Sequence, residues 1–150
     1  MEKQLILTVG LPRSGKSTWV SKQNGIPIVN PDSIRLALHG QRFIAEAEGF
    51  VWAIAKTMTK SLFLAGHDKV IIDATNTTKE RRNFWRSKSW DRYFVVFTTP
   101  ADICFNRAFL TFPDLEPVIE KMQQNWETPT YEEGDDVIGI EFYSGDEDNT

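Results

Sequence analysis

The chain has 150 residues and a formal net charge of −4, with 41% hydrophobic, 25% charged and 12% aromatic residues, which is typical of a soluble globular protein long enough for one domain with a buried core. No apolar run approaches the roughly 18 residues that a membrane-spanning helix needs, and the strand-like N-terminus lacks the features of a secretory signal, so we expect no membrane partner. The single cysteine, Cys104, excludes a disulfide framework and favours a cytoplasmic location.

Short apolar runs alternate with segments whose apolar residues recur every three or four positions, a pattern that predicts strands alternating with helices. In chain order we expect a strand over 4–9, a helix over 16–23, a strand over 26–30, a helix from 31 to about 38, a long helix over 43–65, a strand over 69–73, a helix over 78–87, a strand over 92–98, helices over 100–110 and 114–126, and a strand over 137–142. Asn30 is expected to cap the helix that begins at Pro31.

This alternation predicts an α/β domain over residues 1–143, with a mostly parallel five-stranded sheet and helices on both of its faces. Residues 144–150 are expected to form an acidic, flexible tail. Ligands of such sheets bind at the carboxyl ends of the strands. The residues that follow the first four strands, namely 10–17, 30–32, 73–76 and those after 98, are therefore expected to lie on one rim.

The first predicted turn is Gly10-Leu11-Pro12-Arg13-Ser14-Gly15-Lys16-Ser17, which matches the Walker A pattern G-x4-G-K-[ST] without substitution. In such a loop the glycines let successive backbone N–H groups approach a phosphate chain, and the following helix adds its N-terminal dipole. Lys16 is expected to reach the β- and γ-phosphates, and the Ser17 hydroxyl to bind Mg²⁺. Gly10 to Thr18 are thus predicted to bind ATP, with a simple tight glycine turn as the alternative.

Asp73 ends the apolar strand predicted over 69–73, the place of a Walker B carboxylate, which holds Mg²⁺ directly or through water. An Asp at the end of a strand also serves ordinary turn chemistry. The Walker A loop elsewhere in the chain favours the metal-binding role.

The phosphate loop by itself does not distinguish a switch, a motor and a kinase. The sequence lacks the Asn-Lys-x-Asp segment with which a GTPase reads its base, and a motor ATPase normally needs a longer chain. The length and the short connections favour a small kinase of the nucleotide-kinase architecture. Such an enzyme needs a base near the acceptor hydroxyl and cations around the transferred phosphoryl group.

Asp32 and Arg35 fit the acceptor side of such a kinase. They are three residues apart at the start of a predicted helix, so they share one helical face. A carboxylate could then face a hydroxyl while a guanidinium faces a nearby phosphate. The alternative is an acidic residue favoured by the helix dipole, with an ion pair to the arginine one turn later.

Three segments, LILTVGLPRSGKSTW, NPDSIR and VIIDATNTTKERR, resemble in this order the kinase domain of the bacteriophage polynucleotide kinase–phosphatase and its P-loop relatives. The similarity extends to about residue 140 and implies a P-loop NTPase fold of the nucleotide-kinase type. It implies that Asp32 is the general base for a 5′-hydroxyl, that Arg35 grips the adjacent acceptor phosphate, and that Arg107 stabilises the transferring phosphoryl group. Asp73 and Asn76 are also expected to bind the substrate.

The chain departs from this family in the lid that follows the fourth strand. Where the phage enzyme has a second lid arginine, which contacts the donor phosphates, this chain has Thr111. Another cation is therefore expected to take that place, with Arg13, Arg81 and Arg82 as candidates.

Charge is unevenly distributed along the chain. Residues 131–150 carry eight acidic and no basic side chains, so the first 130 residues carry a net charge of +4. Residues 79–92 carry six basic residues against two acidic ones, which predicts either a surface for a nucleic-acid backbone or a solvated helix face. Trp85, Trp90 and Trp126 are expected to pack in the interior rather than stack on bases, and Cys104 to be a packing residue.

Together these features predict an ATP- and Mg²⁺-dependent kinase of a bacterial or phage-infected cytoplasm, with Asp32, Lys16 and Arg107 as catalytic residues. The predicted acceptor is a hydroxyl of a nucleic acid, foremost the 5′-hydroxyl of a polynucleotide. A hydroxymethylated base in DNA, a nucleoside or a small metabolite is the alternative acceptor. A nucleotide-binding regulatory module without phosphoryl transfer is the alternative class.

Overall fold

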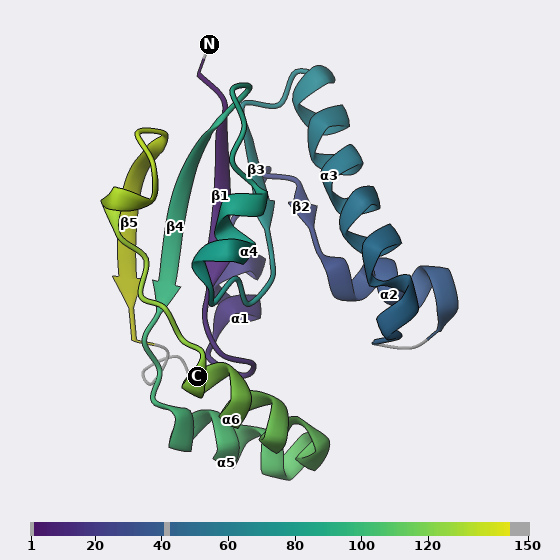
Figure 1. Ribbon diagram of the computed structural model, residues 1–150, viewed down its shortest axis with the longest axis vertical. Helices are drawn as coiled ribbons and strands as arrows, with labels where there is room; N and C mark the ends of the chain where they lie inside the picture. The colour runs from purple at the N-terminus through teal and green to yellow at the C-terminus, as the bar shows by residue number, and fades with distance from the viewer. Residues whose placement is uncertain (1, 41–42, 145–150) are drawn as a thin grey trace.

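The computed structural model describes residues 2–40 and 43–144. Its centre is a five-stranded sheet in the order β2-β3-β1-β4-β5, in which every neighbouring pair is parallel. The predicted α/β class with a parallel five-stranded sheet is thus confirmed, and Figure 1 shows the helices arranged around this sheet. Of the predicted acidic tail, residues 145–150 lie outside the described residues, and the domain boundary at residue 143 stays a prediction.

The strands follow the predicted apolar runs closely, with one exception. Their bounds are β1 Gln4–Val9, β2 Ile28–Val29, β3 Lys69–Ile72, β4 Asp91–Phe97 and β5 Val137–Tyr143. β2 has two residues where the sequence predicted five. Pro27 has no N–H to donate to a neighbouring strand, although its carbonyl still accepts a hydrogen bond of 2.9 Å from the Ile71 N–H.

Six α-helices and three 3₁₀ turns connect the strands within the described part of the chain. The helices are α1 Lys16–Ser21, α2 Pro31–His39, α3 Glu48–Leu64, α4 Lys79–Phe84, α5 Ala101–Thr111 and α6 Glu116–Gln124, and the turns are Ala45–Ala47, Pro113–Leu115 and Tyr131–Glu133. Asn30 caps α2 as predicted, since its side-chain oxygen accepts hydrogen bonds from the N–H groups of Asp32 (2.8 Å) and Ser33 (3.3 Å). Within residues 2–40 and 43–144, no helix combines the length and apolarity that crossing a membrane requires.

The sheet has a buried core on each face because successive strand side chains point to opposite sides. One core contains Leu5 and Leu7 of β1 together with residues of α3 and the Trp85 that ends α4. The opposite core contains Ile6 of β1 and Val20 of α1. The prediction of helices on both faces is therefore confirmed.

The carboxyl ends of the strands form the edge of the sheet on which the candidate site lies. Figure 1 shows α5 and α6 beyond the ends of β4 and β5, and α2 beyond the end of β2. A small apolar cluster of Leu11, Cys104, Ala108 and Ile119 packs the loop after β1 against α5 and α6. The predicted packing role of Cys104 is confirmed by its complete burial in this cluster.

Candidate active site

The loop between β1 and α1 is a narrow turn with two residues in the left-handed region. Gly15 has φ 105° and Arg13 has φ 68°, and a non-glycine residue in this region is uncommon and concentrated at functional sites. Gly10 is needed for space rather than for φ, because a Cβ there would lie 2.5 Å from Ser14 Oγ. The Thr99 hydroxyl donates to the carbonyl of Ser14 (2.7 Å), which ties the loop to the end of β4.

Lys16 lies inside this loop rather than in solvent. Its side chain folds back so that Nζ donates hydrogen bonds to the carbonyls of Gly10 (3.0 Å) and Leu11 (2.6 Å) and to Ser14 Oγ (3.4 Å). Burial lowers the pKa of Lys16 to about 8, although the negative charge of Asp73 opposes this shift. The loop thus holds a desolvated cation whose donors can turn to phosphate oxygens.

Asp73 follows β3 and lies close to the loop lysine. Its N–H donates to the Val29 carbonyl (2.9 Å) and its Oδ2 accepts a hydrogen bond from Asn30 Nδ2 (3.3 Å), so the ends of β2 and β3 are joined there. Burial raises the pKa of Asp73, and the positive charge of Lys16 counteracts that shift. Asp73 is thus a half-buried carboxylate within electrostatic range of the loop lysine.

The predicted magnesium ligands, Ser17 and Asp73, fit that ion. No cluster of three or more His, Cys, Asp or Glu side chains suited to hold a metal occurs within the described residues. Mg²⁺ does not need such a cluster, because it takes most of its ligands from phosphates and water and only one or two from protein. The Ser17 hydroxyl is exposed and lines the same cleft as Asp73.

Asn76 lies in the loop between β3 and α4 with φ 45° and is 1% exposed. Its Nδ2 donates to the Thr8 carbonyl (2.8 Å), and its own carbonyl accepts from Arg82 Nη1 (2.9 Å). Its Oδ1 is buried and accepts no hydrogen bond from the part of the chain that the structure describes. Asn76 therefore fixes this loop against β1, and its contact with substrate stays a prediction.

Asp32 and Arg35 share one face of α2, as predicted, and form an ion pair of 2.7 Å. The Asp32 side chain is 67% exposed, whereas that of Arg35 is 13% exposed. Two further N–H groups of Arg35 bind Glu48 of α3, through Nε to Oε2 (2.8 Å) and Nη2 to Oε1 (2.7 Å). These two hydrogen bonds, which Arg35 donates and the Glu48 carboxylate accepts, raise the pKa of Arg35 and lower the pKa of Glu48.

Arg107 projects from α5 toward the loop. Its Nη1 donates to the carbonyl of Arg13 (3.0 Å), and the Arg13 guanidinium lies 5.2 Å from the centre of the Phe112 ring. Thr111 is exposed, and its hydroxyl donates to the Arg107 carbonyl (3.2 Å) within the helix. Arg13 and Arg107 both line the cleft, so two cations stand near the loop although the second lid arginine is replaced.

Arg82, a candidate for the missing lid cation, is excluded from that role because it is completely buried. Its Nη2 pairs with Glu133 Oε2 (2.9 Å), and it also donates to backbone carbonyls, including that of Asn76. Arg92 is buried likewise and pairs with Asp136 (2.6 Å). Two of the six cations in the basic run 79–92 are therefore in the interior. The cationic surface that this run can offer is smaller than its composition indicated.

Arg81 has a different environment from Arg82, because neighbouring residues of a helix point about 100° apart. Its guanidinium lies 3.7 Å from the centre of the Trp52 ring, and both residues line the cleft. Trp85 and Trp90 are buried, as predicted, and Trp126 packs against the same core.

The sequence-based reasoning missed Trp52 and Glu48, which the fold brings to the site. A usable signal was present, because they are one turn apart on the long predicted helix and so share a face. Nothing in the sequence around them indicated that this face meets α2 and α4.

One cleft of about 1170 Å³ contains nearly all of these groups. The predicted site residues that line it are Pro12, Arg13, Gly15, Lys16, Ser17, Thr18, Asp32, Arg35, Asp73, Asn76 and Arg107. Among the described residues, five cationic and three carboxylate side chains line the cleft, although the whole chain has a net charge of −4. The positive excess suits an anionic ligand such as a polyphosphate.

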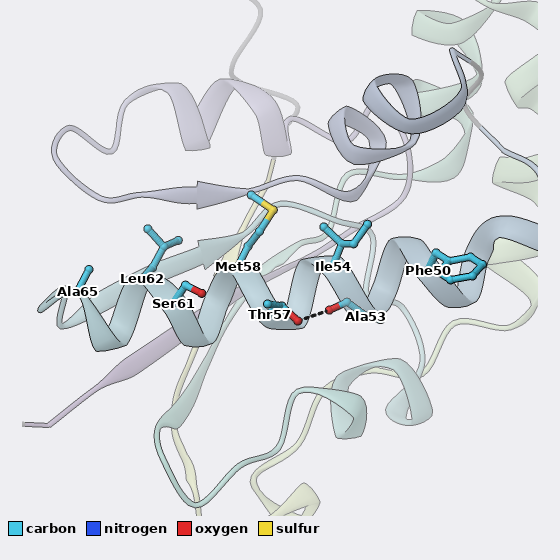
Figure 2. Close-up of a pocket in the computed structure, with 8 residues that line it drawn as sticks. All are labelled: Phe50, Ala53, Ile54, Thr57, Met58, Ser61, Leu62 and Ala65. Atoms are coloured by element: carbon cyan, nitrogen blue, oxygen red, sulfur yellow. Dashed lines mark hydrogen bonds between the residues drawn. The ribbon is translucent and has the colours of Figure 1, made fainter.

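A second hollow of about 590 Å³ lies along α3 and is different in chemistry (Figure 2). It is lined by α3 residues and the following Ala65, among them Phe50, Ile54, Met58 and Leu62, and its described lining contains no charged side chain. It therefore offers nothing to bind or transfer a phosphate, and the polar cleft is the candidate site.

A family model described as an AAA domain matches residues 5–108, well over half of the chain. The chain belongs to this family, and its fold is that of a P-loop kinase. The resemblance to polynucleotide kinases that the three sequence segments predicted is confirmed at the level of the family.

Solved structures with the same fold include kinases with different acceptors. A chain in the structure of a Pnkp1/Rnl/Hen1 complex is 27% identical with a TM-score of 0.63, over 73% of this chain and 40% of that one. A fungal RNA kinase is 15% identical with a TM-score of 0.65, over 98% and 40%. The APS kinase CysC of Mycobacterium tuberculosis, solved with AMPPNP and APS, is 17% identical with a TM-score of 0.63, over 98% and 93%.

The chain covers less than half of the length of the chains it matches in the two Pnkp1/Rnl/Hen1 structures, 40% and 47%. The fold defines a P-loop kinase domain, and these neighbours as a group do not define its acceptor.

Proposed function

We propose that the protein is an ATP- and Mg²⁺-dependent kinase that transfers the γ-phosphate to a hydroxyl of a nucleic acid, foremost the 5′-hydroxyl of a polynucleotide. The observation that carries the proposal is that one cleft joins the phosphate loop to the exposed carboxylate of Asp32. Donor and acceptor could therefore meet in a single space. The three ordered sequence segments, and the 27% identity to a chain of the Pnkp1/Rnl/Hen1 complex, also support it.

Asp32 would act as the general base. It accepts the proton of the acceptor hydroxyl while that oxygen forms a bond to the γ-phosphorus. The bond between the γ-phosphorus and the oxygen that bridges it to the β-phosphate breaks, and ADP leaves. The ion pair with Arg35 engages only Oδ1 of Asp32, which leaves Oδ2 for the acceptor.

Lys16 and Arg107 would neutralise the charge of the transferring phosphoryl group, because such transition states are stabilised mainly by fixed charges. Gly10 to Thr18 would hold the ATP phosphates through the loop and its helix N-terminus. Ser17 and Asp73 would hold Mg²⁺, which would supply positive charge to offset the negative charge of the phosphates. Arg35 would hold Asp32 in place and border the acceptor, with Asp73 and Asn76 close by.

A different acceptor, such as a hydroxymethylated base in DNA, a nucleoside or a small metabolite, is the second candidate. The observation in its favour is the burial of Arg82 and Arg92 in ion pairs with Glu133 and Asp136. These two arginines are not available on the surface to a long nucleic acid, whose phosphate backbone depends on such cations for affinity.

The test is an acceptor panel incubated with γ-labelled ATP and Mg²⁺. It contains DNA and RNA oligonucleotides with 5′-hydroxyl ends, the same oligonucleotides with 5′-phosphate ends, duplex DNA with hydroxymethylated bases, nucleosides and phosphorylated small alcohols. We expect label on the 5′-hydroxyl oligonucleotides and none on their 5′-phosphorylated controls. Label confined to internal bases or to small acceptors would support the second candidate. ATP binding without label on any acceptor would overturn the kinase proposal.

A further inference from the structure

The guanidinium of Arg81 lines the cleft and is partly buried, but among the described residues it is packed against aromatic rings rather than paired with a carboxylate. It stacks at 3.7 Å from the centre of the Trp52 ring and lies 5.6 Å from that of Phe84. Over residues 2–40 and 43–144, no carboxylate lies within ion-pair distance of it, and it donates no side-chain hydrogen bond. Burial lowers the pKa of Arg81, with the charge of Glu48 acting in the opposite direction.

This geometry leaves the hydrogen-bond donors of Arg81 available. The five N–H groups of a guanidinium lie around its edge in one plane, whereas an aromatic ring covers a face. Stacking on Trp52 therefore fixes the orientation of the group and keeps its donors unused. A fixed, desolvated guanidinium with unused donors suits a planar two-point contact to a phosphate.

Arg35 has fewer donors available, because three of its five guanidinium N–H groups are already used. Nε and Nη2 bind Glu48 and Nη1 binds Asp32, each at 2.8 Å or less. A phosphate could bind Arg35 only by displacing a carboxylate or by using the remaining N–H groups. Glu48 thereby fixes Arg35 beside the proposed base. Arg81 is a nearby cation whose side-chain N–H groups are not used within the described residues.

The charges that face Arg81 come from three elements: Glu48 of α3, Arg35 of α2 and Glu80 of its own helix. Glu48 is shared with Arg35, which holds it by two hydrogen bonds. A phosphate group at Arg81 would therefore meet a cation that no carboxylate neutralises directly.

We propose that Arg81, stacked on Trp52, binds a phosphate of the acceptor and makes the enzyme prefer acceptors that carry a phosphate near the reactive hydroxyl. This inference rests on the proposed kinase function. Arg81 then makes the contact to the acceptor phosphate that the family resemblance implied for Arg35. Arg13 and Arg107 serve the phosphates of the donor instead.

The first test measures binding without turnover. The donor half of the cleft is saturated with ADP and Mg²⁺, and the affinities for adenosine 3′-phosphate and for adenosine are measured by calorimetry. We expect Arg81→Gln to weaken the binding of adenosine 3′-phosphate by about tenfold to a hundredfold, the usual effect of losing a charge-assisted contact. Binding of adenosine should be unchanged.

Matched variants separate this role from a structural one. Arg86→Gln, which removes a half-exposed arginine at the end of the same segment, should leave both affinities unchanged. Arg81→Lys keeps the charge but loses the planar contact, so it should restore only part of the affinity. The thermal midpoint of unfolding of each variant is measured alongside to show that the cleft is still folded.

The inference is overturned if Arg81→Gln binds adenosine 3′-phosphate as tightly as the wild-type protein, or if it loses both ligands equally. It is also overturned if the variant raises only the KM for ATP, since Arg81 would then serve the donor. Turnover with γ-labelled ATP tests the underlying function separately. A protein that binds adenosine 3′-phosphate through Arg81 yet labels no acceptor would overturn the kinase and retain the subsite.

Discussion

The two halves of the cleft are built in different ways. The donor half, comprising Gly10–Thr18, Asp73 and Arg107, is organised by backbone conformation and burial, with Lys16 only 8% exposed and held by carbonyls of its own loop. The acceptor half, comprising Asp32, Arg35, Glu48, Trp52 and Arg81, is organised by side-chain contacts between three helices. A donor site of this kind is shared by many P-loop proteins, whereas the acceptor half depends on side chains that are easily changed.

The largest expected effect lies in the acceptor half. Asp32→Asn should lower the rate of phosphoryl transfer by about 10²–10⁴-fold, because the amide cannot accept the proton of the hydroxyl. The Kd for ATP should stay within about twofold, since ATP binds the other half. Rates come from single-turnover transfer and Kd from calorimetry.

Asp68→Asn is the matched control, because Asp68 is exposed and lies before β3, at the opposite end of the strands. It should leave transfer unchanged. Unchanged transfer in Asp32→Asn would remove Asp32 from the base role, and a loss of ATP binding would break the separation of the two halves.

The next effect is on stability and concerns the buried ion pair between Arg82 and Glu133. Arg82→Met should lower the free energy of unfolding by about 3–5 kcal/mol, because it leaves the buried Glu133 carboxylate without its partner. Arg86→Met should lower it by less than about 1 kcal/mol, since that side chain is half exposed. Urea unfolding measures both. If the two variants lowered the free energy of unfolding equally, Arg82 would not be a structural residue and would again be a candidate surface cation.

Arg107→Gln should lower the transfer rate by roughly 10²–10³-fold, the usual loss when one charge-stabilising donor is removed from a transition state. Arg13→Gln should act mainly on ATP binding and raise its KM by about tenfold. Steady-state kinetics with varied ATP distinguishes the two. A larger rate loss in Arg13→Gln than in Arg107→Gln would mean that the loop arginine has the catalytic role assigned to the lid.

The smallest effect is a pH dependence of the donor half. With a pKa of about 8 in the nucleotide-free protein, Lys16 is protonated at pH 7 and mostly neutral at pH 9, and phosphates bind only the protonated form tightly. The affinity for ADP, measured in EDTA to remove any metal contribution, should therefore be about tenfold weaker at pH 9 than at pH 7. Lys16→Arg, whose guanidinium stays charged, should show no such change. Equal wild-type affinity at both pH values would contradict the lowered pKa of this lysine.

The contrast between the halves also explains what could be predicted from sequence. The alternation of strands and helices along the chain, the glycine-rich loop and the N-cap of Asn30 follow from local patterns and were predicted, whereas the order of the strands within the sheet was not. Arg82 and Arg92 were not recognised as buried, because their partners Glu133 and Asp136 are more than forty residues away and outside any local window. Trp52 and Glu48 were missed for the same reason, since only the packing of α3 beside α2 and α4 gives them a role.

The proposed 5′-hydroxyl kinase activity is tested most directly by the position of the label after transfer to a 5′-hydroxyl oligonucleotide. The wild-type protein is incubated with γ-labelled ATP and Mg²⁺, and the product is digested to 5′-mononucleotides and separated. We expect all label on the 5′-terminal nucleotide and its removal by a phosphatase that acts on 5′ ends. Label on other nucleotides, or none on an oligonucleotide despite measured ATP binding, would contradict the proposed activity.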